Sequence, residues 1–244
     1  MDKIEVQILN PEVLANCERM VVCAARLTQR GHKITNMEDF MELYNKEYTP
    51  TLIERMCNLP HPTIQKFGVI NVAVVGASRR FLAQITRHQN EVKFMSASLQ
   101  YSNYGGAADF VVPYDVIQAG KQDEYIETCK KAMDAYEAFT KEGVNHDAAG
   151  YMAPQGLRNV LIISATPYQW KHMIGQRSCN RNTAETQYVM LRIWEELSKL
   201  SPSLFKNCGP FCMTDKCKEG KMSCGEVMSG TPTEILDEKF DLIR

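Results

Sequence analysis

Residues 84–106, QITRHQNEVKFMSASLQYSNYGG, bring many polar side chains together in one short stretch. Arg87, His88 and Gln89 are consecutive, and serine, glutamine and tyrosine dominate residues 96–102. The apolar period of a core helix or strand is lost soon after Arg87, and the aromatic content is too high for a disordered linker. The stretch therefore predicts a structured polar loop that could bind a polar ligand.

These residue types supply charged and neutral hydrogen-bond donors, which suit phosphate oxygens and the carbonyl groups of a heteroaromatic ring. Basic residues at the end of a helix can also simply complement the helix dipole. Taken alone, Arg87 and His88 fit both interpretations about equally well.

A second polar group is predicted on a helix over residues 166–177. His172 and Gln176 stand at positions i and i+4, so they are neighbours on the helix surface, and Arg177 opens the polar run RSCNRNT. An amphipathic helix with Trp170 anchored in the core explains the same residues and, in isolation, is the favoured interpretation.

Two further positions have a structural explanation beside a functional one. Arg158 precedes the apolar strand NVLII and needs a partner, which could be an anionic ligand or a carboxylate of the protein itself. His61, Pro62 and Thr63 form a turn by default, and ligand binding is the less favoured interpretation.

The surrounding elements must position these residues. Apolar alternation predicts strands over residues 3–9, 66–77 and 157–164, and residues 109–117 are expected to be extended or a turn. Helical spacing and capping residues predict helices over residues 11–27, 37–47, 49–59, 78–88, 121–143, 166–177 and 182–200. Because strands and helices do not alternate as in a βαβ series, we expect an α+β fold. The sequence contains no GxGxxG, no P-loop and no GxSxG elbow.

The composition excludes several classes of protein. The chain has 244 residues, of which 44% are hydrophobic and 23% charged, which fits one domain with a sizeable core. The net charge of −1 gives no electrostatic reason to expect nucleic acid or an anionic membrane as a partner. No apolar run reaches the length of a membrane span, and the first residues lack a signal-peptide core. We expect a cytoplasmic protein.

Four of the nine cysteines crowd together near the end of the chain, with the spacing C-x3-C-x4-C-x6-C: Cys208, Cys212, Cys217 and Cys224. Four thiolates in one short loop could form a tetrahedral zinc site. The absence of a CxxC pair weakens that interpretation, so reduced thiols or a disulfide stay open as alternatives. We expect a single domain over residues 1–205 and a cysteine-rich extension over residues 206–244 that packs on it.

Several short segments, taken in order, resemble motifs of the flavin-dependent thymidylate synthases. The family signature is Arg-His-Arg, a gap, and a serine that leads into Gly-Arg-Tyr-Ser. Here residues 87–89 are Arg-His-Gln and residues 98–102 are Ser-Leu-Gln-Tyr-Ser. Four more segments resemble other family elements: residues 24–28, 61–63, 154–158 and 170–177. The match covers roughly residues 20–200 and is far more specific than any single motif.

The chain departs from the family pattern at three signature positions. Gln89 and Gln100 stand where the family has arginines, the second of which helps to hold the nucleotide phosphate, and Ser96 replaces an acidic residue. The gap before Ser98 is one residue longer than the common pattern. The sequence is therefore similar to a divergent branch of the family.

The resemblance implies a homotetramer with a central antiparallel-rich sheet, flanking helices and active sites between subunits. It implies non-covalently bound FAD, with dUMP converted to dTMP, methylene-tetrahydrofolate as carbon donor and NADPH as reductant. It assigns these residues to the flavin: Thr28, His61, Thr63, Arg87, His88, Gln89 and Gln176. It assigns these residues to dUMP: Ser98, Leu99, Gln100, Arg158 and Arg177.

The resemblance also implies catalytic roles for Arg177 and Arg87, which would favour negative charge on the pyrimidine and on the reduced flavin. Cys179 is not expected to act as a nucleophile, because Ser178 and Asn180 are poor acid–base partners. Related activities stay open: methylation of UMP, hydroxymethylation at C5, or a non-catalytic nucleotide-binding role, which Gln89 and Gln100 would favour.

Overall fold

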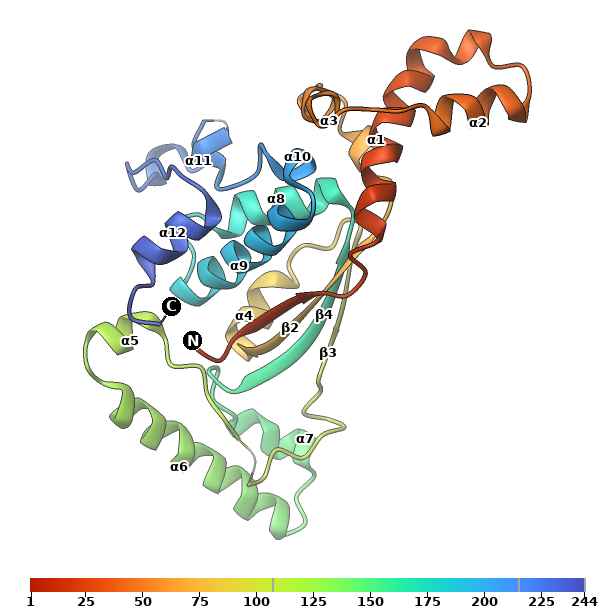
Figure 1. The fold of residues 1–244 in the computed structure, drawn as a ribbon. Helices are drawn as coiled ribbons and strands as arrows, with labels where there is room; N and C mark the ends of the chain where they lie inside the picture. Colours follow the sequence, from red (N-terminus) through yellow and green to blue (C-terminus); the bar gives the residue numbers. More distant parts are fainter. Residues whose placement is uncertain (107, 215, 244) are drawn as a thin grey trace.

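The computed structural model describes residues 1–106, 108–214 and 216–243, and a four-stranded sheet lies at its centre (Figure 1). The strands are β1 (Glu5–Ile8), β2 (Ile70–Ser78), β3 (Val92–Ser96) and β4 (Arg158–Ala165), in the spatial order β1-β2-β4-β3. All neighbouring strands are antiparallel. This sheet and its helices confirm the predicted α+β class.

The central strands β2 and β4 follow from their sequence alternation. Side chains of a strand point alternately to its two faces, and Val72 and Val74 of β2 are buried on the same side as Leu161 and Ile163 of β4. Gly76 lies at a bulge in β2 with a φ of 81°, where a Cβ would meet the Lys3 carbonyl oxygen at 2.7 Å. The predictions for β1, β2 and β4 are confirmed.

The prediction that residues 84–106 form one polar loop is wrong at its centre, where β3 lies. Val92 pairs with Ala165 and Ser96 with Leu161, so β3 is an edge strand of the sheet. Lys93 and Met95 point outward. A five-residue edge strand with only one buried side chain has too weak an alternation to be recognised, and its pairing partner lies far along the chain.

The seven predicted helices lie close to their expected positions, but a short helix over residues 114–118 ends the segment 109–117 that was expected to be extended or a turn. The longer ones are α1 (Val13–Arg30), α2 (Met37–Asn45), α3 (Pro50–Cys57), α4 (Arg79–Ile85), α6 (Gln122–Lys141), α8 (Pro167–Arg177), α9 (Ala184–Leu200) and α12 (Pro232–Lys239). Shorter helical segments are α5 (Tyr114–Gln118), α7 (His146–Ala149), α10 (Pro202–Phe205), α11 (Phe211–Thr214) and the 3-10 turns η1 (Gly31–Lys33), η2 (Pro62–Gln65), η3 (Gly150–Met152) and η4 (Gly220–Met222).

One face of the sheet carries the main core. Helices α4 and α9 pack against the strands, and α8 packs on α9 (Figure 1). Trp170 of α8 is fully buried, and its indole Nε1–H donates to the Ile70 carbonyl oxygen at 3.1 Å. This arrangement confirms Trp170 as a core anchor, and it leaves the opposite surface of α8 free to carry the polar residues.

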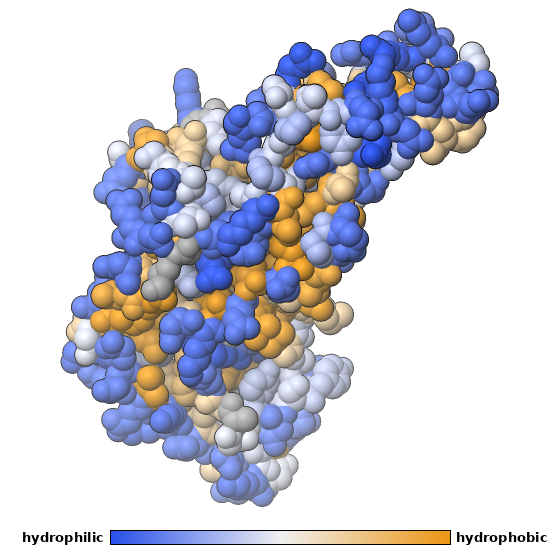
Figure 2. All heavy atoms as spheres, in the orientation of Figure 1, coloured by the Kyte–Doolittle hydropathy of each residue, from blue (hydrophilic) through white to orange (hydrophobic). Residues whose placement is uncertain are grey.

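The other face of the sheet carries an exposed apolar patch. Val75, Val160 and Ile162 remain 42–47% exposed although they lie on central strands. Figure 2 shows hydrophobic residues in orange over the strands, between the projecting α1–α2 arm and the α6 end of the molecule. An exposed apolar patch of this kind on a sheet is typical of a protein–protein contact.

Two helical units extend from opposite ends of the sheet (Figure 1). Helices α1 and α2 form a projecting arm, in which the Asn36 and Thr49 side chains cap α2 and α3. At the other end, α6 and α7 surround a small separate core that includes Phe110, Met133 and Tyr136.

The C-terminal segment lies over α8 and α9. Helix α12 packs on α9, with the Phe240 ring 5.2 Å from the rings of Tyr114 and Tyr188. The capping box of Thr231 and Glu234 begins α12. Among the described residues, no helix combines the length and apolar character needed to cross a membrane.

Candidate functional site

The C-terminal end of α8 brings Arg177 against His88. Thr166 caps the N-terminus of α8 and Pro167 occupies its first turn. The helix ends at Arg177, where the polar segment begins. The Arg177 Nε–H donates to His88 Nε2 at 2.8 Å, and Nη1 lies 3.4 Å from the Asn182 side-chain oxygen. Two motifs that are far apart in sequence therefore meet in space.

His88 is a neutral acceptor in this arrangement. Burial, the Arg177 charge and His172 lower the pKa of His88 to about 4. Because Nε2 accepts from Arg177, the neutral ring carries its proton on Nδ1. The His172 ring centroid lies 5.9 Å away, and burial together with Lys218 and Arg177 also lowers the pKa of His172.

Two guanidinium groups share this region without a carboxylate partner. Burial, and then the charge of Arg87, lowers the pKa of Arg177. Neither Arg87 nor Arg177 takes part in an ion pair in the described parts of the chain. Arginine stays protonated at physiological pH, so an anion bound here would relieve the repulsion between the two cations.

The outer surface of α8 borders several hollows. His172 lines three neighbouring cavities of about 220, 410 and 430 Å³. Gln176 borders the first of them, and Lys171 borders the second, where its Nζ donates to the Gln65 side-chain oxygen at 2.7 Å. An elongated polar ligand could follow this surface.

The predicted nucleotide residues Ser98, Leu99 and Gln100 line a different cavity, of about 520 Å³. The loop that carries them is fixed by local bonds: the Gln100 N–H donates to Ser98 Oγ at 3.1 Å, and the Gln100 carbonyl oxygen lies 2.6 Å from His146 Nε2. Arg79 and Gln155 also line this cavity, although neither residue was assigned to a ligand from the sequence.

Arg158 has the structural partner that the sequence left open. Its Nη1 donates to the Gly76 carbonyl oxygen at 2.8 Å, and its Nε lies 3.1 Å from the Asp109 carboxylate. Arg158 is not among the residues that line the 520 Å³ cavity. Its contact with dUMP stays a prediction.

Thr28, His61 and Thr63 belong to other elements than the Arg177–His88 pair, whereas Gln89 directly follows His88 in the chain. Thr28 is exposed near the end of α1, where its hydroxyl donates to the Ala25 carbonyl oxygen at 2.8 Å. His61 directly precedes η2 and Thr63 lies within it, both exposed, and Gln89 is exposed after α4. Within the described residues, no hydrogen bond joins these side chains to Arg177 or to Ser98. In one chain, Arg177 of the predicted nucleotide set lies with His88 of the predicted flavin set, while Ser98, Leu99 and Gln100 line a separate cavity.

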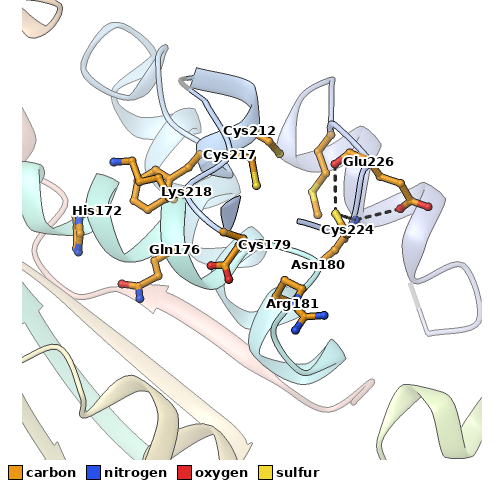
Figure 3. Close-up of a pocket in the computed structure, with 14 residues that line it drawn as sticks. His172, Gln176, Cys179, Asn180, Arg181, Cys212, Cys217, Lys218, Cys224 and Glu226 are labelled. Carbon is orange, nitrogen blue, oxygen red and sulfur yellow. Dashed lines mark hydrogen bonds between the residues drawn. The ribbon is translucent and has the colours of Figure 1, made fainter. Parts of the chain in front are cut away.

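The four cysteines predicted to bind zinc do not come together. Cys208 is buried in the main core, and burial raises the pKa of its thiol to about 12. Cys212, Cys217 and Cys224 instead line the 220 Å³ cavity, together with Cys179 (Figure 3). The described residues contain no group of three or more His, Cys, Asp or Glu side chains placed to hold a metal ion. The predicted set fails because Cys208 packs as a core residue, next to a glycine that lies against Trp194.

The surroundings of Cys179 do not favour the thiolate that a nucleophilic cysteine needs. Burial, followed by the charges of nearby Glu219, Cys224 and Cys212, raises the pKa of its thiol. Figure 3 shows Cys179 beside the cysteine-rich segment at the end of α8. Since α8 ends at Arg177, the thiol lies beyond the helix and borders the 220 Å³ cavity, while Arg177 bonds to His88.

Comparisons with known proteins show the family of this chain. The family model described as thymidylate synthase complementing protein matches residues 12–203. The chain is 25% identical over 211 residues to a flavin-dependent thymidylate synthase of Geobacter sulfurreducens, which covers 86% of this chain and 89% of the relative. It is 23% identical over 242 residues to the enzyme of the same name from Clostridium tetani, covering 91% and 94%.

Two solved structures have the same fold. The UMP/dUMP methylase PolB from Streptomyces cacaoi, bound with 5-Br dUMP, superposes with a TM-score of 0.66 at 16% identity, covering 85% of this chain and 96% of that one. Thymidylate synthase X from Helicobacter pylori, with FAD and dUMP, superposes with a TM-score of 0.63 at 16% identity, covering 84% and 98%.

Proposed function

The chain belongs to the thymidylate synthase complementing protein family, whose curated relatives are flavin-dependent thymidylate synthases, and from this membership we propose that it methylates dUMP to dTMP. The co-substrates in this proposal are methylene-tetrahydrofolate as carbon donor and NADPH as reductant. The observation that carries the proposal is the pair of guanidinium groups, Arg87 and Arg177, without a carboxylate partner in the described residues.

The chain has features that suit FAD. The adenine dinucleotide is elongated and anionic, and the cavities along α8 offer a long surface with polar side chains such as His172 and Gln176. Arg87 supplies an exposed cation near Arg177 at the C-terminal end of α8, where burial and then the Arg87 charge lower the pKa of Arg177. Thr28, His61, Thr63, His88 and Gln89 complete the proposed flavin set. When bound, the flavin supplies the redox chemistry of the reaction.

Arg177 is the proposed catalytic residue on the nucleotide side. Its Nε–H donates to His88, and this bond fixes the orientation of the planar guanidinium. The N–H groups on its two terminal nitrogens are then held in fixed directions. A fixed cation beside the pyrimidine favours negative charge on the ring, which makes C5 nucleophilic without a covalent bond to the protein. His88 is the proposed positioning residue for Arg177, because a neutral imidazole accepts the bond without cancelling the charge.

We further propose that the active site is completed by other copies of the chain in a homotetramer. The flavin residues and the 520 Å³ cavity with Ser98, Leu99 and Gln100 are separate within one chain. The exposed apolar face, which includes Val75, Val160 and Ile162, is a suitable surface for joining copies. Light scattering of the purified protein would test this assembly.

A second candidate function is methylation of UMP as well as dUMP. The specific observation in its favour is the likeness of fold to the UMP/dUMP methylase PolB. A non-catalytic nucleotide-binding role remains the alternative class, because Gln89 and Gln100 each replace a family arginine.

Flavin absorbance distinguishes these functions. Protein purified with bound FAD is reduced anaerobically by NADPH, and methylene-tetrahydrofolate is then added with dUMP, with UMP or with neither nucleotide. The proposal expects rapid reoxidation with dUMP only. Equal reoxidation with UMP would favour the second candidate, and a flavin that never turns over would favour the non-catalytic role.

A further inference from the structure

Arg79 is a second basic residue in the cavity that contains the predicted nucleotide loop. It is the first residue of α4, and its backbone N–H donates to the Leu157 carbonyl oxygen at 3.0 Å. The preceding residue is also fixed, because Ser78 donates from its N–H and its hydroxyl to the buried Glu185 carboxylate at 2.6 and 2.5 Å. These bonds hold the start of α4 against the approach to β4.

The Arg79 guanidinium is left without a partner. Its Nη1 is buried and has no hydrogen-bond acceptor, and within the described residues Arg79 forms no ion pair. Buried polar groups are nearly always satisfied, and a charged one more so, since an unpaired buried charge is unfavourable. The unsatisfied Nη1 of this half-buried arginine therefore makes it suited to bind an anion in the cavity.

The lining of the cavity suits a phosphate group. Ser96, Ser98, Gln100 and Gln155 offer neutral donors around Arg79. One carboxylate, Asp147, also lines the cavity, but it is exposed and forms no ion pair with Arg79. The planar fork of a guanidinium matches phosphate oxygens better than any other side chain does.

Arg158 and Arg177 each have a partner of their own, and Arg87 does not line this cavity. Arg158 is bound to Gly76 and Asp109, and Arg177 is bound to His88. At residue 100, where the family has a phosphate-binding arginine, this chain has a neutral glutamine. The cavity would then lack a cation unless Arg79 supplies one.

We propose that Arg79 binds the 5′-phosphate of the nucleotide and supplies the positive charge that Gln100 lacks. This inference rests on the proposed function for the identity of the nucleotide. The chemical requirement itself is a phosphate monoester dianion, held by Arg79 from α4 and by Ser98 and Gln100 from the loop.

Calorimetric titration of the FAD-loaded full chain tests the inference with dUMP, deoxyuridine and inorganic phosphate as probes. We expect Arg79→Gln to weaken dUMP binding about tenfold to a hundredfold and to abolish phosphate binding. The affinity for deoxyuridine, which has no phosphate, should stay unchanged. Arg79→Lys keeps the charge but loses the fork, so its dUMP affinity should be intermediate.

Two matched variants separate the local contact from general charge. Arg80→Gln removes the same charge from the exposed neighbouring residue and should leave dUMP affinity unchanged. Asp147→Asn removes the only carboxylate lining the cavity in the described chain and should tighten phosphate binding. Melting temperature and FAD content, measured for every variant, show whether the fold is kept.

Each outcome has a distinct meaning. The inference is overturned, and the proposed function stands, if wild-type protein binds dUMP and a folded Arg79→Gln or Arg79→Lys variant binds it with the same affinity. The same conclusion follows if Arg79→Gln lowers the affinities for dUMP and deoxyuridine by the same factor. If wild-type protein binds phosphate through Arg79 but not dUMP, the proposed function fails and the phosphate site stands. Binding of neither probe by wild-type protein would overturn both.

Discussion

Arg177 and His88, which are 89 positions apart in sequence, are joined by a 2.8 Å hydrogen bond from Nε to Nε2. The bond requires an unprotonated Nε2, and the low pKa of His88, about 4, meets that requirement at neutral pH. His88 therefore orients the Arg177 guanidinium and leaves its positive charge uncompensated for a ligand.

Arg177→Lys tests whether the shape of the guanidinium matters as well as its charge. A lysine keeps the charge but cannot bond His88 and the substrate at the same time. We expect kcat/KM for dUMP to fall about a hundredfold or more, with FAD content unchanged. Arg55→Lys is the matched control, since Arg55 is an exposed arginine of α3 and does not line the cavities along α8. A loss of kcat/KM below about threefold in Arg177→Lys would contradict this role, because a contact made in the transition state should cost far more when it is removed.

The stability of the protein should depend on pH through His88. Its folded pKa of about 4 lies below the ordinary value of 6.5, so the unfolded chain binds more protons between these values. This contribution to stability is present above pH 6.5 and is lost as the pH falls toward 4. Burial, Lys218 and Arg177 also lower the pKa of His172, which adds in the same direction.

Urea unfolding of His88→Gln at several pH values measures this dependence. Glutamine can still accept from Arg177 through its side-chain oxygen but does not titrate. We expect the free energy of unfolding of wild-type protein to fall more steeply than that of the variant between about pH 7 and about pH 4.5. Parallel curves for the two proteins would contradict a pKa of His88 that is lowered by folding.

Cys179→Ala should retain catalysis. The thiol has a raised pKa, and it lies with Cys212, Cys217 and Cys224 around the 220 Å³ cavity. We expect kcat to remain at least about a tenth of the wild-type value, a change in barrier of about 1.4 kcal/mol or less. A loss of about a thousandfold with normal FAD and dUMP binding, or a covalent nucleotide adduct on Cys179, would disprove this prediction.

Gly175 is predicted to be required by the packing of the C-terminal segment on α8. A Cβ at this position would lie 2.4 Å from a ring carbon of Phe211. Although Gly→Ala inside a helix is otherwise stabilising by about 1 kcal/mol, we expect Gly175→Ala to destabilise the protein by about 1–3 kcal/mol.

The control is the same substitution in a Phe211→Ala background, where the clash is absent. There Gly175→Ala should be neutral or stabilising, so its effect on the free energy of unfolding should differ between the two backgrounds of the double-mutant cycle. An equal cost in both backgrounds would place the requirement for glycine elsewhere.

The sequence predicted the parts of the fold that have strong local periodicity. Helix α8 begins with Thr166 and Pro167 as expected, and Trp170 is its core anchor. Strand β3 was missed, since only Val92 among its five residues is buried and its pairing with β4 is not local.

The motifs predicted the polar residues but not how they group. Nothing in a linear spacing shows that Cys208 enters the core while Cys179 joins the later cysteines. Arg79 was overlooked for a similar reason, since an arginine in the first turn of a helix is usually solvated. Its unpaired Nη1 is visible only when the whole fold surrounds it.

The mass of the nucleotide product tests the central claim most directly. Wild-type protein loaded with FAD is incubated with dUMP, methylene-tetrahydrofolate and NADPH, beside Arg177→Lys and a sample without NADPH. We predict a product with the mass of dTMP in the wild-type sample, strongly reduced in the variant and absent without NADPH. Unchanged dUMP in the wild-type sample, or a product with the mass of the 5-hydroxymethyl nucleotide, would contradict the assignment of this chain as a dUMP methylase.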